Sequence, residues 1–176
     1  FKMEPIIART TKTETKYGEK TQINLATLWH YYQPPDQTDD WVKLISQQTY
    51  IPFSKWLANA KNDFQVAVNI NYSLIKHLIR LGLDEVIENL GRAAEKGKIE
   101  LTGSAAYHPI LPDLLKYKGG ESEVKRQIEL NDKFNREIFG SIWNPRGFFP
   151  PEMAFSPELS IVIKDMGYQW TITDAP

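Results

Sequence analysis

Three segments of the chain place a histidine or a carboxylate among aromatic residues, glycine and proline. Such side chains can move protons or attack an electrophilic carbon, and proline stiffens the backbone that presents them. Aromatic rings beside them offer flat surfaces on which a ring-shaped ligand can stack. The segments are residues 28–35 (LWHYYQPP), which contain His30, residues 103–112 (GSAAYHPILP), which contain His108, and residues 147–155 (GFFPPEMAF), which contain Glu152.

The first segment combines hydrogen-bonding and stacking groups. His30 and Gln33 can form hydrogen bonds with hydroxyl groups, and Trp29 or Tyr32 can stack on a sugar ring. The double proline at 34–35 stiffens the loop that carries them. Aromatic residues also fill protein cores, so the same pattern is equally consistent with a strand end that completes the core.

His108, in the second segment, follows a run of small residues at 103–106, which lets the backbone approach another group closely. Tyr107 and Pro109 flank it and restrict its position. Histidine titrates near neutral pH, so His108 is a candidate for ligand binding or proton transfer. The alternative is a structural histidine, as expected for His77 in the middle of a predicted helix.

Glu152, in the third segment, follows two prolines and lies among Phe148, Phe149 and other apolar residues. Apolar neighbours control both the protonation and the orientation of a carboxylate. A rigid carboxylate at the end of a strand suits covalent attack on the anomeric carbon of a sugar. The alternative is a cap for the helix predicted to begin at Ser156, although Glu158 already interacts with the dipole of that helix.

Other kinds of chemistry have weaker support. Asp174, after the last predicted strand, is a candidate for substrate binding and equally fits a turn. The chain has no cysteine, no close histidine pair and no HExxH motif, so no metal site is expected. It also has no GxxxxGK[ST], GxGxxG or GxSxG motif, so no nucleotide or other cofactor is expected.

The elements that must position these residues alternate between strand and helix, which is typical of a parallel α/β fold. Functional residues of such folds follow the C-terminal ends of the strands. Predicted strands are residues 23–29, 64–70, 98–102, 146–150 and 169–173; predicted helices are two short ones within 41–60 separated at Pro52, then 71–80, a segment between Gly82 and Gly97, 122–139 and 156–166, with a long loop at 103–120.

Two architectures fit this alternation: an open doubly wound sheet and a (β/α) barrel. A complete barrel usually needs more than about 200 residues. A chain of 176 residues with about five strands would therefore form only a portion of a barrel.

Composition narrows the choice of partner and location. Lys and Arg number 21 against 22 Asp and Glu, so a neutral partner is favoured over nucleic acid. Residues 1–21, polar and without an apolar period, are predicted to form a flexible lead-in to a domain of residues 22–176. No run is apolar enough to indicate a membrane partner, and the lack of cysteine favours a cytoplasmic location without fixing it.

The three segments resemble the conserved regions of glycoside hydrolase family 57. Residues 28–34 (LWHYYQP) are similar to LWHxHQPxY, residues 103–115 (GSAAYHPILPDLL) to GSxxYHPILPLL, and residues 147–156 (GFFPPEMAFS) to GxWPxEGAxS. The similarities occur in the family's order and together span residues 23–176. The resemblance implies a (β/α)7-type barrel, here its N-terminal portion with about five parallel strands, and retaining hydrolysis or transfer of α-glycosidic bonds in α-glucans.

The resemblance also implies roles for single residues. Glu152 matches the catalytic nucleophile, and His108, His30 and Gln33 match residues that line the adjoining sugar subsite. Tyr32 stands where the family usually has a histidine, and unlike histidine it does not titrate near neutral pH. The family's acid/base aspartate lies in a fourth region that this sequence does not contain, so the isolated chain is expected to be inactive.

The expected partners are an oligo- or polysaccharide and either the remainder of a parent chain or a second copy, since half a barrel exposes sheet edges. Two other functions stay open. A non-catalytic glycan-binding or regulatory barrel is favoured by Tyr32. A polysaccharide deacetylase would need an aspartate and two histidines around a metal, at a spacing that this chain lacks.

Overall fold

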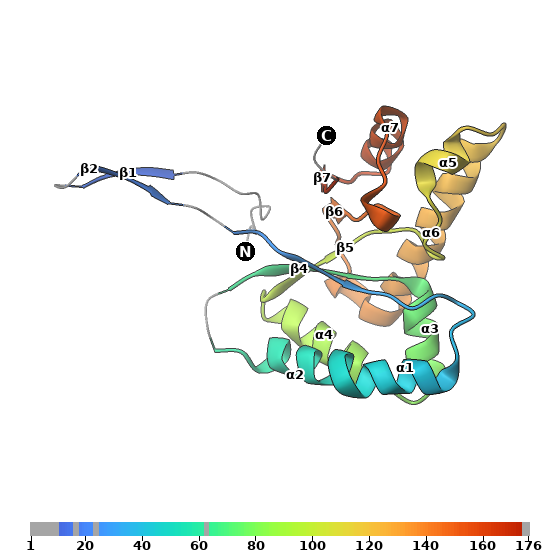
Figure 1. Cartoon of the computed structure of the whole chain (residues 1–176), viewed down its shortest axis with the longest axis horizontal. Coiled ribbons are helices and arrows are strands. Elements are labelled where there is room, and N and C mark those ends of the chain that lie inside the picture. Colours follow the sequence, from blue (N-terminus) through green and yellow to red (C-terminus); the bar gives the residue numbers. More distant parts are fainter. Residues whose placement is uncertain (1–10, 16–17, 23–24, 62–63, 174–176) are drawn as a thin grey trace.

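The computed structural model describes residues 11–15, 18–22, 25–61 and 64–173. From residue 28 onwards helices alternate with parallel strands, and a separate hairpin projects away from them (Figure 1). The strands are β1 (Thr11–Thr15), β2 (Gly18–Gln22), β3 (Leu28–Tyr31), β4 (Val66–Ile70), β5 (Ile99–Thr102), β6 (Gly147–Phe148) and β7 (Trp170–Thr171). The helices are α1 (Asp39–Ile45), the π-helix η1 (Ser46–Tyr50), α2 (Ile51–Asn59), α3 (Tyr72–Arg80), α4 (Glu85–Glu95), α5 (Leu111–Leu115), α6 (Gly120–Phe139), α7 (Pro157–Asp165) and the short 3₁₀ helices η2 (Gly140–Ile142) and η3 (Pro151–Met153).

The parallel strands follow one another in chain order. β3, β4 and β5 form one sheet, and β6 pairs with β7. A single parallel bridge between Gly103 and Phe148 joins the two groups, and the Phe149 N–H donates to the Gly103 carbonyl at 2.9 Å. A doubly wound sheet requires the strand order to reverse, and no reversal occurs among the described strands. Sequential parallel order is the arrangement of (β/α) barrels.

The two faces of the β3–β4–β5 sheet differ in polarity because successive side chains of a strand point to opposite sides. One face packs against helices and contributes Trp29, Tyr31, Val66, Val68, Ile70, Ile99 and Leu101 to the larger hydrophobic core. The other face carries His30, Asn69, Glu100 and Thr102. The polar face is therefore the one that can present chemistry.

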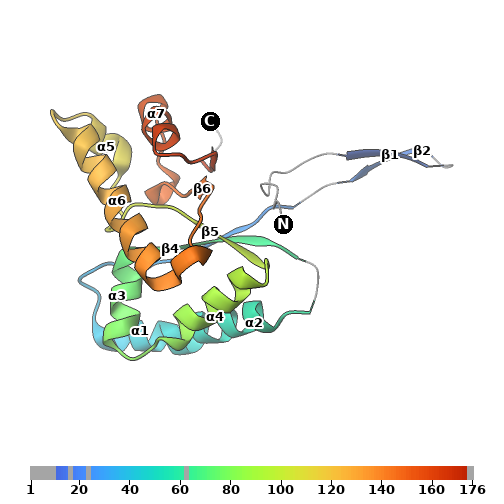
Figure 2. The same ribbon diagram turned by 180° about the vertical axis from the view of Figure 1, so that it is seen from behind.

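Helix α6 joins the two hydrophobic cores of the molecule. Figure 2 shows it running from the level of α3 and α4 to α5. Near its start, Val124 and Ile128 pack in the smaller core with Phe148 and with residues of α7. Near its end, Phe134 and Ile138 pack against the larger core. These four apolar residues of the helix predicted at 122–139 are thus all in contact with a core.

The strands predicted from sequence are all present, but the first is displaced. It was expected at residues 23–29, whereas β3 spans Leu28–Tyr31 and residues 25–27 are not in a strand. Pairing decides these bounds, because the register with β4 runs from Leu28 opposite Ala67 to Tyr31 opposite Ile70. His30 consequently lies inside the strand instead of in the loop after it.

Two helical expectations also need correction. Pro52 does not separate two helices, because α1, η1 and α2 follow one another directly and Pro52 occupies the first turn of α2, where its missing N–H is not needed. The predicted loop at 103–120 contains helix α5.

Part of the N-terminal segment 1–21, predicted to be a flexible lead-in, is instead a β-hairpin. The segments 11–15 and 18–22 pair as the antiparallel hairpin β1–β2, so part of the region expected to be a flexible lead-in has regular structure. Residues 1–10 and 16–17 lie outside the described residues.

Helix ends agree with the sequence signals. Ser156 caps α7 by accepting a hydrogen bond from the Leu159 N–H at 3.3 Å, directly before Pro157. Gly97 and Gly167 follow α4 and α7 with φ of 68° and 94°, which residues other than glycine rarely adopt.

Candidate active site

Two histidines meet at the polar face of the sheet. His30 lies on β3 and His108 on the loop after β5, and their Nε2 atoms are 3.0 Å apart. Both strands are parallel neighbours of β4, so their C-terminal ends reach the same edge. Residues 78 positions apart in the chain thus form one hydrogen-bonded pair.

His30 is held on its other side by Asn69. The His30 Nδ1 atom lies 2.8 Å from Asn69 Oδ1, and the Asn69 amide nitrogen donates to Thr102 Oγ1 at 3.3 Å. Asn69 and Thr102 are fully buried, so neither the oxygen nor the nitrogen of the Asn69 amide can form its hydrogen bond with water. The adjacent strands β3, β4 and β5 each contribute one member to this row of polar side chains.

Glu152 lies beside the second histidine. Its Oε1 atom is 3.5 Å from His108 Nδ1, and its side chain is 68% exposed, whereas that of His108 is 3% exposed. The carboxylate therefore faces open space with a buried imidazole at its side. The described part of the chain thus supplies the row Thr102, Asn69, His30, His108 and Glu152.

Both His108 and Glu152 have backbone conformations that are unfavourable for residues with a Cβ atom. Their φ angles are 60° and 56°, and Met153 follows at 53°. Left-handed backbone costs about 1–2 kcal/mol for each non-glycine residue. Such outliers persist only where surrounding structure holds them, and they cluster at functional sites.

Aromatic rings enclose the histidine pair. Tyr32 stacks on His108 with ring centroids 4.0 Å apart and an angle of 18° between the planes. Phe149 packs against His30 with centroids 4.5 Å apart. Tyr32, the residue that stands in place of the histidine expected from the family resemblance, therefore contacts the site through its ring.

Burial favours the neutral form of both histidines. Burial, followed by the repulsion that a protonated His30 would exert, lowers the pKa of His108 to about 4. Removal from water also lowers the pKa of His30 below 6.5, although part of this residue remains exposed; the Asn69 hydrogen bond and the charge of Glu152 act in the opposite direction. Burial raises the pKa of Tyr32, and the charges of Asp36 and Glu152 add to this effect.

A pocket of about 340 Å³ opens in front of these residues. It is lined by Leu28, His30, Phe149, Glu152, Met153 and Ile172. Glu152 is the one carboxylate among these lining residues, and most of the remaining wall is apolar. A site with a single carboxylate and apolar walls can bind the face of a sugar ring and attack it, but needs a proton donor from elsewhere.

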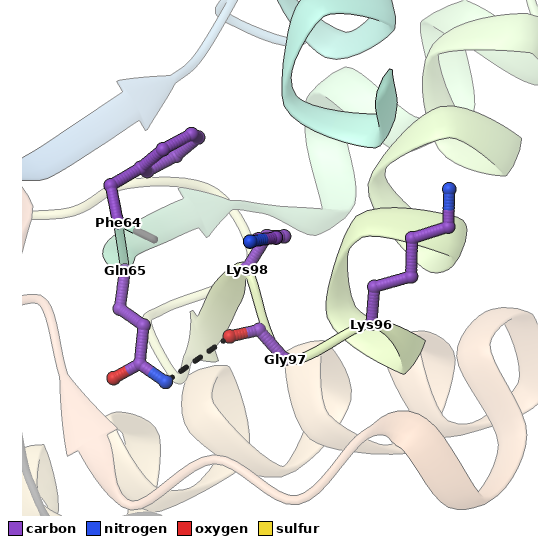
Figure 3. Close-up of a pocket in the computed structure, with 5 residues that line it drawn as sticks. All are labelled: Phe64, Gln65, Lys96, Gly97 and Lys98. Atoms are coloured by element: carbon purple, nitrogen blue, oxygen red, sulfur yellow. Dashed lines mark hydrogen bonds between the residues drawn. The ribbon is translucent and has the colours of Figure 1, made fainter. Parts of the chain in front are cut away.

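A second pocket, of about 430 Å³, lies at the opposite ends of β4 and β5 (Figure 3). Its lining residues are Phe64, Gln65, Lys96, Gly97 and Lys98, which precede these strands. The Gln65 side chain donates to the Gly97 carbonyl at 3.3 Å, so the two loops are tied together there. The described residues that line this pocket include no carboxylate and no histidine, and it is therefore not the candidate active site.

Gln33 lies one layer behind the site. Its amide nitrogen donates to Tyr50 Oη at 3.0 Å and its amide oxygen accepts from Gln37 at 3.1 Å. Tyr50 in turn donates to the Tyr32 carbonyl at 2.9 Å. Gln33 thus supports the backbone of Tyr32 through Tyr50.

Trp29 is not at the site. It neighbours His30 on β3 and therefore points to the other face, where its ring lies 4.0 Å from Phe53 and 5.9 Å from Trp56 of α2. The expectation that Trp29 stacks on a ligand beside His30 is corrected accordingly: it belongs to the core beneath the helices. Asp174, the last residue expected at the site, lies outside the described residues.

Asn69 was not singled out from the sequence. A signal was present, because it is the one polar residue in the apolar strand β4 (VAVNI), and it alternates with Val68 and Ile70. A polar side chain in such a strand must find a partner on the opposite face.

Two further properties bear on the class of site. Within the described residues, no three side chains among His, Cys, Asp and Glu gather as a metal site would require. The described helices include none whose length and apolar character would suit a membrane span.

Known proteins are similar to this chain in sequence and in fold. The sequence model of glycosyl hydrolase family 57 matches residues 7–175. An alpha-amylase of Pyrococcus horikoshii is 28% identical over 153 residues, which cover 87% of this chain and 23% of that protein. The chain thus spans about a quarter of the length of this relative.

Two solved structures are similar in fold. A 4-alpha-glucanotransferase from Thermococcus litoralis matches 85% of this chain and 22% of its own, with a TM-score of 0.71 and 19% identity. A CE4 family pseudoenzyme from Bacillus anthracis matches 84% of this chain and 42% of its own, with a TM-score of 0.54 and 13% identity. At these identities the likeness concerns the fold alone.

Proposed function

Because the chain belongs to glycosyl hydrolase family 57, we propose that it is the N-terminal part of a (β/α)7-type barrel in a retaining enzyme that hydrolyses or transfers α-glycosidic bonds in α-glucans. Glu152 is the nucleophile. The observation that carries this proposal is the placement of Glu152: an exposed carboxylate on left-handed backbone, 3.5 Å from a buried imidazole, at the mouth of an apolar pocket.

The reaction proceeds in two steps. A Glu152 oxygen attacks the anomeric carbon, the glycosidic bond breaks, and the leaving oxygen takes a proton from a carboxylic acid. Water or a sugar hydroxyl then attacks the glycosyl-Glu152 ester, loses its proton to the same carboxylate, and releases Glu152. The acid/base group comes from outside the described residues, because Glu152 is the one carboxylate among the described residues that line the pocket.

Substrate binding follows from the walls of the same pocket. His108 offers its Nδ1 atom to a sugar hydroxyl. His30 lines the pocket with its ring, because both of its nitrogens are already hydrogen-bonded to Asn69 and His108, and the apolar residues Phe149 and Ile172 contact the face of the sugar ring. Tyr32 closes the subsite from behind His108, and Gln33 supports Tyr32 through Tyr50. Asp174 remains a proposed ligand of the substrate.

A fluorinated α-glucosyl fluoride tests the nucleophile separately from the missing acid. Fluoride leaves without protonation, so the first step needs Glu152 alone, and a second fluorine on the ring slows the breakdown of the ester. We expect intact-protein and peptide mass spectrometry to find one sugar on Glu152. The Glu152→Gln variant stays unlabelled, whereas Glu129→Gln, which removes an exposed carboxylate on α6, is labelled like the unaltered chain.

The same reagent should be applied to the longest form of the protein that contains this chain. Label on a different carboxylate, or a protein that binds α-glucan and gains no label in either form, contradicts the assignment of Glu152.

A non-catalytic glycan-binding barrel is the second candidate, and Tyr32 is the observation that favours it. Its ring stacks on His108 where the family usually has a histidine, so it fills the subsite with a group that does not titrate near neutral pH. Under this alternative, Glu152→Gln leaves glucan binding and all other behaviour of the longest form unchanged. Under the enzymatic proposal, the same variant retains binding and loses activity.

A further inference from the structure

We propose that Asn69 is a positioning residue that sets the tautomers of both histidines, so that His108 presents an unprotonated Nδ1 to Glu152 and to the bound substrate. The row of side chains from Thr102 to His108 is the structural basis. The tautomer pattern follows from this geometry for neutral rings, and only its effect on the reaction rests on the proposed function.

The first step is the orientation of the Asn69 amide. Its nitrogen donates to Thr102 Oγ1 at 3.3 Å, and its oxygen lies 2.8 Å from His30 Nδ1. An amide oxygen can only accept a hydrogen bond. His30 Nδ1 must therefore carry the hydrogen. In a neutral ring the other nitrogen, Nε2, then has a lone pair and can only accept a hydrogen bond.

The second step transfers this pattern to His108. The two Nε2 atoms lie 3.0 Å apart, a distance that requires a hydrogen between them. Since His30 Nε2 has none, His108 Nε2 must donate it. The neutral His108 ring then has its remaining lone pair on Nδ1.

The third step concerns Glu152. His108 Nδ1 and Glu152 Oε1 are 3.5 Å apart, longer than the usual range of a hydrogen bond, as expected for two acceptors without a shared proton. The carboxylate is thus not weakened as a nucleophile by a donor from His108. A sugar hydroxyl that enters the pocket can instead donate to His108 Nδ1.

Solution NMR can read this pattern directly, because the chain has three histidines. Protonated and unprotonated ring nitrogens have clearly different ¹⁵N shifts. At about pH 7.5, above the ordinary histidine pKa, we expect the Nδ1–H tautomer for His30 and the Nε2–H tautomer for His108.

His77 is an internal control. Its Nε2 lies 2.9 Å from the Pro34 carbonyl, and its Nδ1 accepts from Arg80 at 3.1 Å, so it should be in the Nε2–H form. Both of these hydrogen-bond partners lie outside the row that contains Asn69. The unaltered chain can therefore already overturn the proposal: an Nε2–H tautomer at His30, or an Nδ1–H tautomer at His108, contradicts it.

Two variants then separate a positioning role from a purely structural one. Asn69→Leu keeps a side chain of similar size but removes the acceptor, so we expect mixed tautomers at His30 and His108 and an unchanged His77. Asn69→Asp retains an oxygen that only accepts, and at about pH 8.5, where His30 is neutral, it should restore the pattern of the unaltered chain. Unchanged tautomers in Asn69→Leu, with an intact His77 signal, would show that Asn69 does not set them.

The consequence for the reaction is measured by the rate of labelling with the fluorinated glucosyl fluoride. We expect Asn69→Leu to be slower by about ten- to a hundredfold, and Asn69→Asp to recover much of the rate at the higher pH. If the tautomers follow the prediction while no form of the protein is labelled at Glu152, the proposed function fails and the positioning role stands. If labelling occurs but the tautomers are reversed, the positioning role fails and the function stands.

Discussion

His108 Nδ1 lies 3.5 Å from Glu152 Oε1, and both residues reach this position through left-handed backbone. One residue follows β5 and the other follows β6, two strands joined by the Gly103–Phe148 bridge. The contact thus depends on local strain in two loops and on the pairing of the strands before them. Each of these dependencies can be tested.

Strain at Glu152 predicts an unusual order of stability among its variants. We expect Glu152→Gly to be more stable than Glu152→Ala by about 1 kcal/mol, because glycine adopts a φ of 56° without the cost of a Cβ atom. Urea unfolding of the chain followed by circular dichroism measures the difference. Glu158, exposed in the first turn of α7, is the matched control, and there the alanine variant should be the more stable one. The same order at both positions would argue against strain at Glu152.

The lowered pKa of His108 predicts a loss of stability in mild acid. The unfolded chain binds a proton below about pH 6.5, whereas folded His108 does so only near pH 4, so the free energy of unfolding falls as the pH drops from 6.5 to 4. The measurement is a series of urea unfolding curves across this range. His108→Gln cannot titrate and should show a shallower fall, with the remainder including the contribution of His30. An equally steep fall in the variant would show that His108 is not the source.

Close packing at Gly103 predicts that even one added methyl group is not tolerated. A Cβ atom there would lie 2.3 Å from the Tyr168 ring, next to the bridge that joins β5 to β6. We expect Gly103→Ala to destabilise the chain by about 1–3 kcal/mol, as overpacking does. Gly91 in α4, whose added Cβ would meet its nearest neighbour at 3.9 Å, is the control, and Gly91→Ala should be neutral or stabilising. Thermal unfolding compares the two variants, and equal losses would contradict the packing argument.

The buried Glu100 links β5 to the strands that follow it. Its Oε2 accepts from Arg146 at 3.1 Å and its Oε1 from the Trp170 indole at 3.2 Å. Glu100→Ala removes the acceptor of both donors. We expect it to lower the free energy of unfolding by about 3 kcal/mol, because removal of one partner of a buried pair leaves the charge of the other without its compensating group. Glu100→Gln keeps an acceptor and should cost less.

Glu129→Ala, at an exposed position of α6, provides the baseline for the Glu100 variants. Urea unfolding at neutral pH measures all three. A loss in Glu100→Ala no greater than in Glu129→Ala would mean that the link through Arg146 and Trp170 does not stabilise the fold.

Local patterns identified the elements because their causes are local. The cap at Ser156, the stop at Gly97 and the apolar period of α6 depend on residues within one or two turns of helix. The bounds of β3 could not be predicted from a local pattern, since they depend on the register with β4, which lies almost forty residues further on in the chain. Pro52 was misjudged because proline both ends helices and begins them.

The sequence by itself determined the order of strands and helices, and it drew attention to His30, His108, Tyr32 and Glu152 through residue type and position after strands. Only the tertiary structure decided which side of β3 faces the site, and so separated His30 from Trp29. It also brought Asn69 into contact with His30 and set His108 against Glu152. The physical reason is that strand pairing and sheet curvature fix these contacts between segments far apart in the chain, and no local pattern encodes them.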